Sequence, residues 1–340
     1  MKALVTGADG FVGRHLLEHL RARGDDAVGV DRESDVTDVD SVRARMKEVR
    51  PDAIYHLAAM TAVGASWSNQ VEFTRVNVLG TKNVLDVANE VVPTASVVLV
   101  SSADVYGVVR PEDLPLVETF RVAPANPYAS SKVEAEHVAH DAVRERAQRV
   151  VIARPFNHVG PGQSTDFVVP AIVDRLLAAL ADGADEILVG DLSTRRDFSD
   201  VRDVVRAYRL LVDKGISGEV YNIASGVDVG LFDIAQRLVE AIAPHVRLVT
   251  DESLIRPVEV PLSCGSYEKL HRATSWRPTI ALDTLSLRRT QASATSAGVC
   301  PASRASCAKR WTCSRTLSRM NQDMSCLAVS SAPRLPSGSA

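Results

Sequence analysis

The chain contains few cysteines and no long apolar run. No stretch of apolar residues reaches the roughly 18 that predict a membrane-spanning helix. Met1 and Lys2 lead directly into the apolar residues 3–5, which leaves no room for a signal peptide. We therefore expect a cytoplasmic protein with no membrane partner. With 340 residues, of which 46% are hydrophobic and 24% charged, the composition is that of a soluble globular protein with a large core.

The C-terminal segment 288–340 differs in composition from the rest of the chain. It holds eight of the 39 Lys and Arg residues and one of the 42 acidic residues, so its formal charge is +7 and that of residues 1–287 is −10. It also holds four of the five cysteines: Cys300, Cys307, Cys313 and Cys326. None of these cysteines has the C-x₂₋₄-C spacing and no histidine lies nearby, so we predict no metal site.

The basic residues of this segment are scattered, whereas a nucleic-acid-binding or lipid-binding arm usually clusters them. We also find no helical or alternating apolar pattern. We interpret 288–340 as a disordered, non-native or degenerate C-terminus, with out-of-frame translation as a hypothesis for its origin. We assign it no function and predict no nucleic-acid partner.

A glycine-rich turn lies near the N-terminus. It follows a predicted strand at 2–6 and precedes a predicted helix at 12–21, whose residues Val12, Leu16, Leu17 and Leu20 share one side. Gly7 permits a tight turn, Gly10 lets the backbone approach a pyrophosphate, and Gly13 lets helix and strand pack closely. The helix N-terminus then offers N–H groups to the anion. The alternative is a plain turn between strand and helix.

The second predicted strand, 27–30, ends at Asp31. A carboxylate here accepts hydrogen bonds from the adenosine ribose and repels a 2′-phosphate, which favours NAD. Arg32 follows and could pair with that phosphate, so NADP stays possible. Asp35 and Val36 come next, where a side chain could meet the adenine edge, although an exposed loop acid explains Asp35 equally well.

Further predicted strands at 53–57, 96–100 and 150–153 alternate with helices at 71–89 and around Tyr128. This alternation predicts an α/β fold with a Rossmann-type doubly wound parallel sheet and ligands at the strand C-termini. We expect a dinucleotide-binding domain at 1–160, with later returns near 190–223, and a smaller substrate-binding domain mainly at 161–287. His56 ends one strand, where it either lines the pyrophosphate path or makes a structural hydrogen bond.

Tyr128 and Lys132 are four residues apart, so on a helix they share one face. A nearby cation lowers the pKa of a phenol, which suits proton exchange near neutrality. Ser102 follows the strand 96–100, where it could hydrogen-bond an oxygen that is oxidised or reduced. Asp104 is either a base for a carbon-bound proton or an ordinary loop residue.

Together these motifs resemble the extended short-chain dehydrogenase/reductase family, whose members are mostly nucleotide-sugar epimerases, dehydratases and reductases. The resemblance runs from residue 1 to about 285. It implies a catalytic set of Ser102, Tyr128 and Lys132, and a structural role for Asn77. It also implies that cofactor contacts come from the glycine turn with Phe11 and Val12, and from Leu57, Ala58 and Ala59.

The second half of the chain resembles the part of the family that binds the sugar nucleotide. The segment 154–163 with 167–170 resembles the crossing into the sugar pocket, which implies contacts from Asn157, Phe167 and Val168. The segment 195–204 resembles the loop that supplies an arginine to the diphosphate, and Arg196 matches it best. A helix-start charge cluster capped by Asp200 is the alternative. Arg256 and Glu259 match the element that closes over the nucleoside, where a proline-braced loop is the alternative.

One motif of this segment is closest to the GDP-mannose branch of the family, and within it to GDP-4-keto-6-deoxy-mannose reductases. It reads Phe156-Asn157-His158-x-Gly160-Pro161-Gly162-Gln163. The resemblance thus implies reduction of C4 of a GDP-4-keto-6-deoxyhexose with NAD or NADP. A GDP-mannose 4,6-dehydratase, a 4-epimerase and a non-catalytic dinucleotide-binding protein are the alternatives. Typical dehydratases carry Thr and Glu where this chain has Ser102 and Asp104.

The resemblance also implies a homodimer that pairs through the helix of Tyr128 and its neighbour at 71–90. Four small or apolar residues of the Tyr128 helix could serve either such a partner or the chain's own core: Val133, Ala135, Val138 and Ala139.

Overall fold

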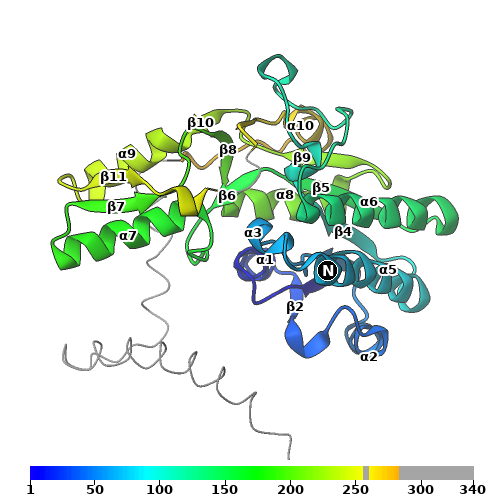
Figure 1. The fold of residues 1–340 in the computed structure, drawn as a ribbon. Coiled ribbons are helices and arrows are strands. Elements are labelled where there is room, and N and C mark those ends of the chain that lie inside the picture. The colour runs from blue at the N-terminus through cyan, green and yellow to red at the C-terminus, as the bar shows by residue number, and fades with distance from the viewer. Residues whose placement is uncertain (256–259, 283–340) are drawn as a thin grey trace, which may run out of the picture. The chain divides into compact units, whose positions relative to one another are not determined.

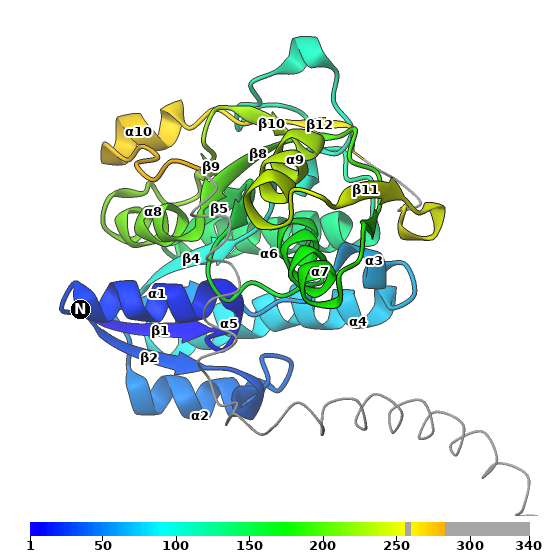
Figure 2. The same cartoon turned by 90° about the vertical axis from the view of Figure 1, so that its left-hand side faces the viewer.

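A computed structural model describes residues 1–255 and 260–282 (Figures 1 and 2). Arg256, Glu259 and the C-terminal segment 288–340, on which the sequence led to specific expectations, lie outside the described residues.

Six parallel strands form the main sheet, in the order β2-β1-β3-β4-β5-β9. Their bounds are Asp26–Val30 (β2), Lys2–Thr6 (β1), Ala53–His56 (β3), Ser96–Val100 (β4), Val150–Pro155 (β5) and Val220–Ile223 (β9). The strand order reverses between β1 and β3, which is where doubly wound sheets bind ligands. The predicted fold class is confirmed, and all five predicted strands begin and end within two residues of the expected bounds.

Helices cover both faces of this sheet. One face packs on α1 (Phe11–Ala22), α8 (Val201–Lys214) and α10 (Glu268–Thr274), and the other on α2 (Val39–Val49), α5 (Gly80–Val91) and α6 (Pro127–Arg146). The alternation of β4 shows why, because Val98 belongs to the first core while Val97 and Leu99 belong to the second. Strands buried on both sides are typical of parallel sheets.

The remaining elements build a second layer with its own apolar core (Figure 1). One small sheet consists of β10 (Asp228–Gly230), β8 (Arg195–Asp200), β12 (Leu262–Ser263) and β6 (Asn157–Val159), and another of β11 (Arg247–Thr250) and β7 (Glu186–Val189). The helices α7 (Val168–Asp182) and α9 (Leu231–Ile242) pack on them. In Figure 1, α7, α9, β7 and β11 gather at the left, away from α2.

Short helical turns complete the described chain. They are η1 (Arg32–Ser34), α3 (Val63–Ser66), α4 (Gln70–Thr74), η2 (Arg75–Leu79), η3 (Ala103–Tyr106), η4 (Pro111–Asp113) and η5 (Glu252–Leu254).

The helix predicted over 71–89 is confirmed over 70–91, with a π-helical turn inside it. It divides into α4, the π-helical turn η2 and α5. Asn77 lies in the π turn and is buried there. Its side-chain oxygen accepts from Met60 N at 2.8 Å and its amide donates to Met60 O at 3.0 Å. These tertiary hydrogen bonds explain the π-helical turn, which apolar periodicity could not reveal.

The sequence sets the start of α6 at the site. Asn126 caps the helix, because its side-chain oxygen accepts from Ala129 N at 2.8 Å, and Pro127 occupies the first helical position, where no N–H is needed. Tyr128 therefore lies in the first turn and Lys132 one turn later. Ala135 and Ala139 of the same helix are buried in the chain's own interior, so they are not available to a partner.

Candidate active site

The glycine turn packs so tightly that side chains are excluded. Gly7 has a φ of 71°, and a Cβ there would lie 2.8 Å from the backbone nitrogen of Ala58. A Cβ on Gly13 would lie 2.2 Å from Gly7 O. The turn and the small residues after β3 thus form a bare backbone surface at the N-terminus of α1. This surface fits a pyrophosphate.

Acidic side chains surround the end of β2. The Asp31 carboxylate accepts from Asp9 N in the glycine turn at 2.9 Å, and Glu33 accepts from Asp31 N at 3.0 Å. Arg32 is exposed beside them. This arrangement keeps Asp31 at the place where a ribose would lie.

The structure gives Asp35 and Val36 local roles. Asp35 accepts from the backbone and the hydroxyl of Thr37, both at 2.9 Å, and the hydrogen bond from Thr37 N is the main reason why its pKa is lowered. Val36 is buried, and a Cβ on Gly80 would lie only 2.6 Å from its side chain. Asp35 thus stabilises its own loop, as the exposed-acid alternative expects.

Phe11, expected at the cofactor, connects the glycine turn to the segment after β5. Its ring stacks on His158, with centroids 6.0 Å apart and planes 10° apart. His15 hydrogen-bonds Pro161 O at 2.8 Å, and Arg14 donates to Gly162 O at 3.1 Å. Val12 packs against the core below. These contacts therefore hold residues 158–162 against the glycine turn and the start of α1.

His56 holds two elements together below the site. Its Nδ1 lies 2.8 Å from Thr6 Oγ1 and its Nε2 lies 3.0 Å from Thr81 Oγ1. Because the Thr81 hydroxyl donates to Asn77 O, it accepts from Nε2–H, and Nδ1 accepts from Thr6. Burial lowers the pKa of His56 to about 3. The ring is neutral and structural, which decides between the two expectations for His56.

Tyr128 and Ser102 meet at the C-terminal edge of β4. Burial raises the pKa of Tyr128, the charge of Asp104 raises it further, and the hydrogen bond with Ser102 opposes both. Ser102 Oγ also accepts from Asp104 N at 3.2 Å. The phenol is therefore protonated at neutral pH and held by the serine.

Lys132 lies beside this pair. Its Nζ is 5.9 Å from the centre of the Tyr128 ring and donates to Val100 O at 2.9 Å. Burial lowers the pKa of Lys132 to about 8, while the Glu136 carboxylate raises it. The net pKa of Tyr128 is raised and not lowered as expected, because burial of the phenol outweighs any effect of the Lys132 charge.

A buried polar network behind the pair was not found from the sequence. Ser101 Oγ donates to Glu136 Oε1 at 2.5 Å, and Arg154 binds the same carboxylate at 2.9 and 2.6 Å. The Arg154 guanidinium lies 4.9 Å from the ring centre of Tyr106, whose hydroxyl donates to Asn222 at 2.7 Å. The spacing of Glu136, four residues after Lys132, was the one available signal.

The expected substrate residues lie on the paired strands β6 and β8 and at the start of α7. Asn157 is exposed on β6, immediately after β5, and Phe167 is 38% exposed at the start of α7. Val168 packs against the second core. Arg196 lies on β8 and donates to Arg195 O at 3.0 Å.

The charge-cluster alternative explains the start of α8. Asp200 accepts from Arg202 N at 2.8 Å as a helix cap, and its other oxygen pairs with the Arg202 side chain at 2.7 Å. These two residues therefore stabilise the start of the helix.

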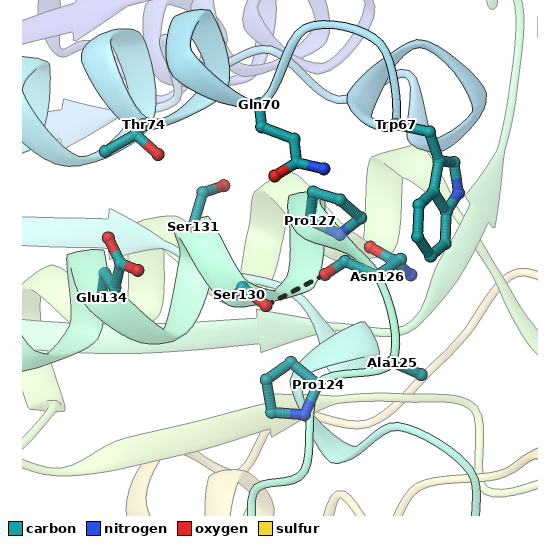
Figure 3. A pocket seen from close by; sticks show the side chains of 10 residues that line it. All are labelled: Trp67, Gln70, Thr74, Pro124, Ala125, Asn126, Pro127, Ser130, Ser131 and Glu134. Atoms are coloured by element: carbon teal, nitrogen blue, oxygen red, sulfur yellow. Dashed lines mark hydrogen bonds between the residues drawn. The ribbon is translucent and has the colours of Figure 1, made fainter.

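A surface hollow of about 360 Å³ lies beside the start of α6 (Figure 3). Trp67, Gln70 and Thr74 line one side of it. The other side is formed by Pro124, Ala125, Asn126, Pro127, Ser130, Ser131 and Glu134. Ser130 is turned back to Asn126 O at 3.2 Å. Tyr128 and Lys132 are not among its lining residues.

Comparisons with known proteins agree with this geometry. The model of the NAD dependent epimerase/dehydratase family matches residues 3–224. The chain belongs to this family.

Similar proteins include GDP-6-deoxy-D-mannose reductase of Pseudomonas aeruginosa, with 35% identity over 285 residues, 83% of this chain and 93% of that protein. GDP-6-deoxy-D-talose 4-dehydrogenase of Aggregatibacter actinomycetemcomitans is 32% identical over 79% of this chain and 90% of its own length. A solved structure of RMD from Pseudomonas aeruginosa complexed with NADPH has a TM-score of 0.78 and 34% identity. It covers 85% of this chain and 97% of its own.

Within residues 1–255 and 260–282, no helix combines the length and apolarity needed to cross a membrane. The same residues contain no group of three side chains suited to hold a metal ion.

Proposed function

We propose that this protein is an NAD(P)H-dependent reductase of the C4 keto group in a GDP-4-keto-6-deoxyhexose. The observation that carries the proposal is Tyr128, a buried and protonated phenol bonded to Ser102 and adjacent to Lys132. The names of the two relatives support the substrate class and the reacting carbon.

The cofactor would lie along Gly7, Gly10 and Gly13, with Asp31 at its ribose and Lys132 near its nicotinamide. When bound, the reduced nicotinamide supplies a hydride to C4. Tyr128 transfers its proton to the C4 oxygen, so the carbonyl becomes a hydroxyl. Ser102 hydrogen-bonds that oxygen and then stabilises the phenolate, together with the positive charge of Lys132. Reprotonation of Tyr128 completes the cycle.

The substrate's diphosphate and sugar would be held by the second layer. We assign contacts to Asn157, Phe167 and Arg196, and the sequence expectation adds Arg256 and Glu259. The contacts of His158 and Pro161 with the helix after the glycine turn support the assignment of Asn157, because His158 is the next residue in the chain.

A dehydratase is the second candidate, favoured by one observation. The Asp104 charge acts on the Tyr128 phenol, so a carboxylate that a dehydratase could use as its base lies in the neighbourhood of the proposed proton donor. The same charge raises the pKa of Tyr128 and so helps to keep the phenol protonated.

A two-arm assay separates these functions. In one arm the protein receives GDP-mannose without reductant, and in the other GDP-4-keto-6-deoxymannose with NADH or NADPH. We expect nucleotide oxidation in the second arm and no keto-sugar in the first. Keto-sugar formation in the first arm alone would contradict the reductase and support the dehydratase.

We propose a preference for NADH, supported by Asp31 and Glu33 at the end of β2. The ratio of kcat/KM for NADH and NADPH tests it. A ratio below one would show that Arg32 dominates the site.

We also propose a homodimer through α4, η2 and α6. Its support is a set of exposed apolar side chains beside α6: Trp67 (38% exposed), Val71 (84%) and Leu79 (44%). Light scattering tests this proposal. We expect the wild type to be a dimer and the Val71→Glu variant to be a monomer. A monomeric wild type would contradict it.

A further inference from the structure

Three successive residues at the end of β4 each contact a different residue of α6. Val100 O accepts from Lys132 Nζ at 2.9 Å, Ser101 Oγ donates to Glu136 at 2.5 Å, and Ser102 bonds Tyr128. The three α6 residues are spaced by four, so they form one stripe on the helix. The middle contact, Ser101 with Glu136, involves neither a proposed catalytic residue nor the solvent.

Glu136 is itself anchored from a second strand. Arg154 of β5 binds both of its oxygens, at 2.9 and 2.6 Å, and the two side chains are 4% and 5% exposed. Burying such a pair costs desolvation energy, and apolar residues of similar volume often stabilise a core as well or better. Its presence directly behind the site therefore points to a role other than folding.

Glu136 also has an electrostatic partner within the stripe. Lys132 lies one turn before it, and the Glu136 charge favours the protonated amine. The other titratable groups near Lys132 are Tyr128, which is protonated, and His56, which is neutral. Arg154 is the other cation, and its charge is already paired with Glu136.

We infer that Glu136, clamped between Ser101 and Arg154, is a positioning residue that fixes the register of α6 against the end of β4. The clamp sets the positions of Lys132 and Ser102 relative to Tyr128, and it favours the charged form of Lys132. This inference rests on the proposed roles of these three residues.

The test uses two readouts, one of which needs no substrate. The first is the pH dependence of amine labelling at Lys132, measured in the cofactor-free protein by peptide mass spectrometry. The second is kcat/KM for reduction of the keto-sugar. The variants are Glu136→Gln and the double variant Glu136→Met/Arg154→Met, with Glu134→Gln, exposed on the same helix, as the matched control.

For Glu136→Gln we expect the labelling midpoint of Lys132 to fall by about one pH unit, because an opposite charge is lost. We expect kcat/KM to fall about 10- to 100-fold, as for a small misplacement of catalytic groups. The double variant should fold with a thermal midpoint near that of the wild type and show the same two losses. Glu134→Gln should show neither.

A folded double variant with unchanged labelling and unchanged kcat/KM would overturn the inference. If the wild type itself lacks reductase activity, the proposed function fails, while the labelling shift still tests the clamp. Failure of Glu136→Gln to fold leaves the double variant to decide.

Discussion

The Nζ of Lys132 lies 5.9 Å from the ring centre of Tyr128, and both side chains are buried at the end of β4. This pair brings a proton donor and a cation to the C-terminal end of β4, the strand next to β3 in the sheet. The burial of this pair, and of the elements that hold it, has testable effects on activity and on stability.

Removal of the phenolic oxygen should abolish proton donation but leave the packing intact. For Tyr128→Phe we expect kcat/KM to fall about 10²- to 10⁴-fold, the usual range for losing a general acid. The ring contact with Phe73, at 6.4 Å, remains, so thermal stability and NADH affinity should change little. Steady-state kinetics with a parallel fluorescence titration of NADH checks both. Activity within threefold of the wild type would exclude Tyr128 as the acid.

Lys132→Met should lose activity and gain stability. Burial lowers the lysine pKa from 10.5 to about 8, which amounts to roughly 3 kcal/mol against the charged form. Loss of the bond to Val100 O offsets about 1 kcal/mol of this, so we expect a net gain of about 1–2 kcal/mol at pH 7.

The sign of the Lys132 effect can be checked by pH. Because the folded-state pKa is depressed, the cost is fully present below about pH 8 and disappears above the unfolded value of 10.5. Urea unfolding of the wild type and of Lys132→Met at pH 7 and near pH 10.5 measures this. The extra free energy of unfolding of the variant should be smaller at the higher pH. A variant less stable than the wild type at pH 7 would contradict the burial argument.

His56 should make the protein sensitive to acid. Its folded pKa of about 3 lies below the unfolded 6.5, so its stabilisation is present above pH 6.5 and is lost as the pH falls toward 3. Between pH 7 and pH 5 this loss is about 2 kcal/mol. His56→Gln, which cannot titrate, should be less stable at pH 7 but lose about 2 kcal/mol less on acidification. Equal losses in both proteins would show that His56 is already charged.

The glycine turn should tolerate no side chain at Gly13. A Cβ there would collide with Gly7 O at 2.2 Å, so Gly13→Ala should weaken NADH binding at least about tenfold or unfold the N-terminal region. Gly64→Ala is the matched control, since a Cβ at Gly64 meets no atom within 4 Å. Calorimetric titration with NADH, alongside thermal unfolding, compares the two. Equal binding by both variants would argue against a pyrophosphate at this turn.

The sequence predicted those parts of the site that depend on local order. The strand, glycine turn and helix at 2–22 follow one another directly, and Tyr128 and Lys132 need only one helix, so their juxtaposition was predictable. The π turn at Asn77 and the clamp of Glu136 between Ser101 and Arg154 were not. They depend on contacts between segments that are 17 to 54 residues apart, and apolar periodicity carries no information about such polar contacts.

The pKa of Tyr128 is a second property that could not be predicted from the sequence. The spacing of Tyr128 and Lys132 suggested a lowered value, but the depth of burial, which only the fold determines, reverses the direction. The raised pKa keeps the phenol protonated throughout the neutral range.

The central claim is that Tyr128 and a reduced nicotinamide act on C4 of the same sugar. The most direct test is to react GDP-4-keto-6-deoxymannose with nicotinamide that carries deuterium at its transferable position and to locate the label by NMR. We expect one deuterium at C4 for each cofactor oxidised, with labelling about 10²- to 10⁴-fold slower in Tyr128→Phe. Label at C6, or conversion of the sugar without cofactor oxidation, would contradict it.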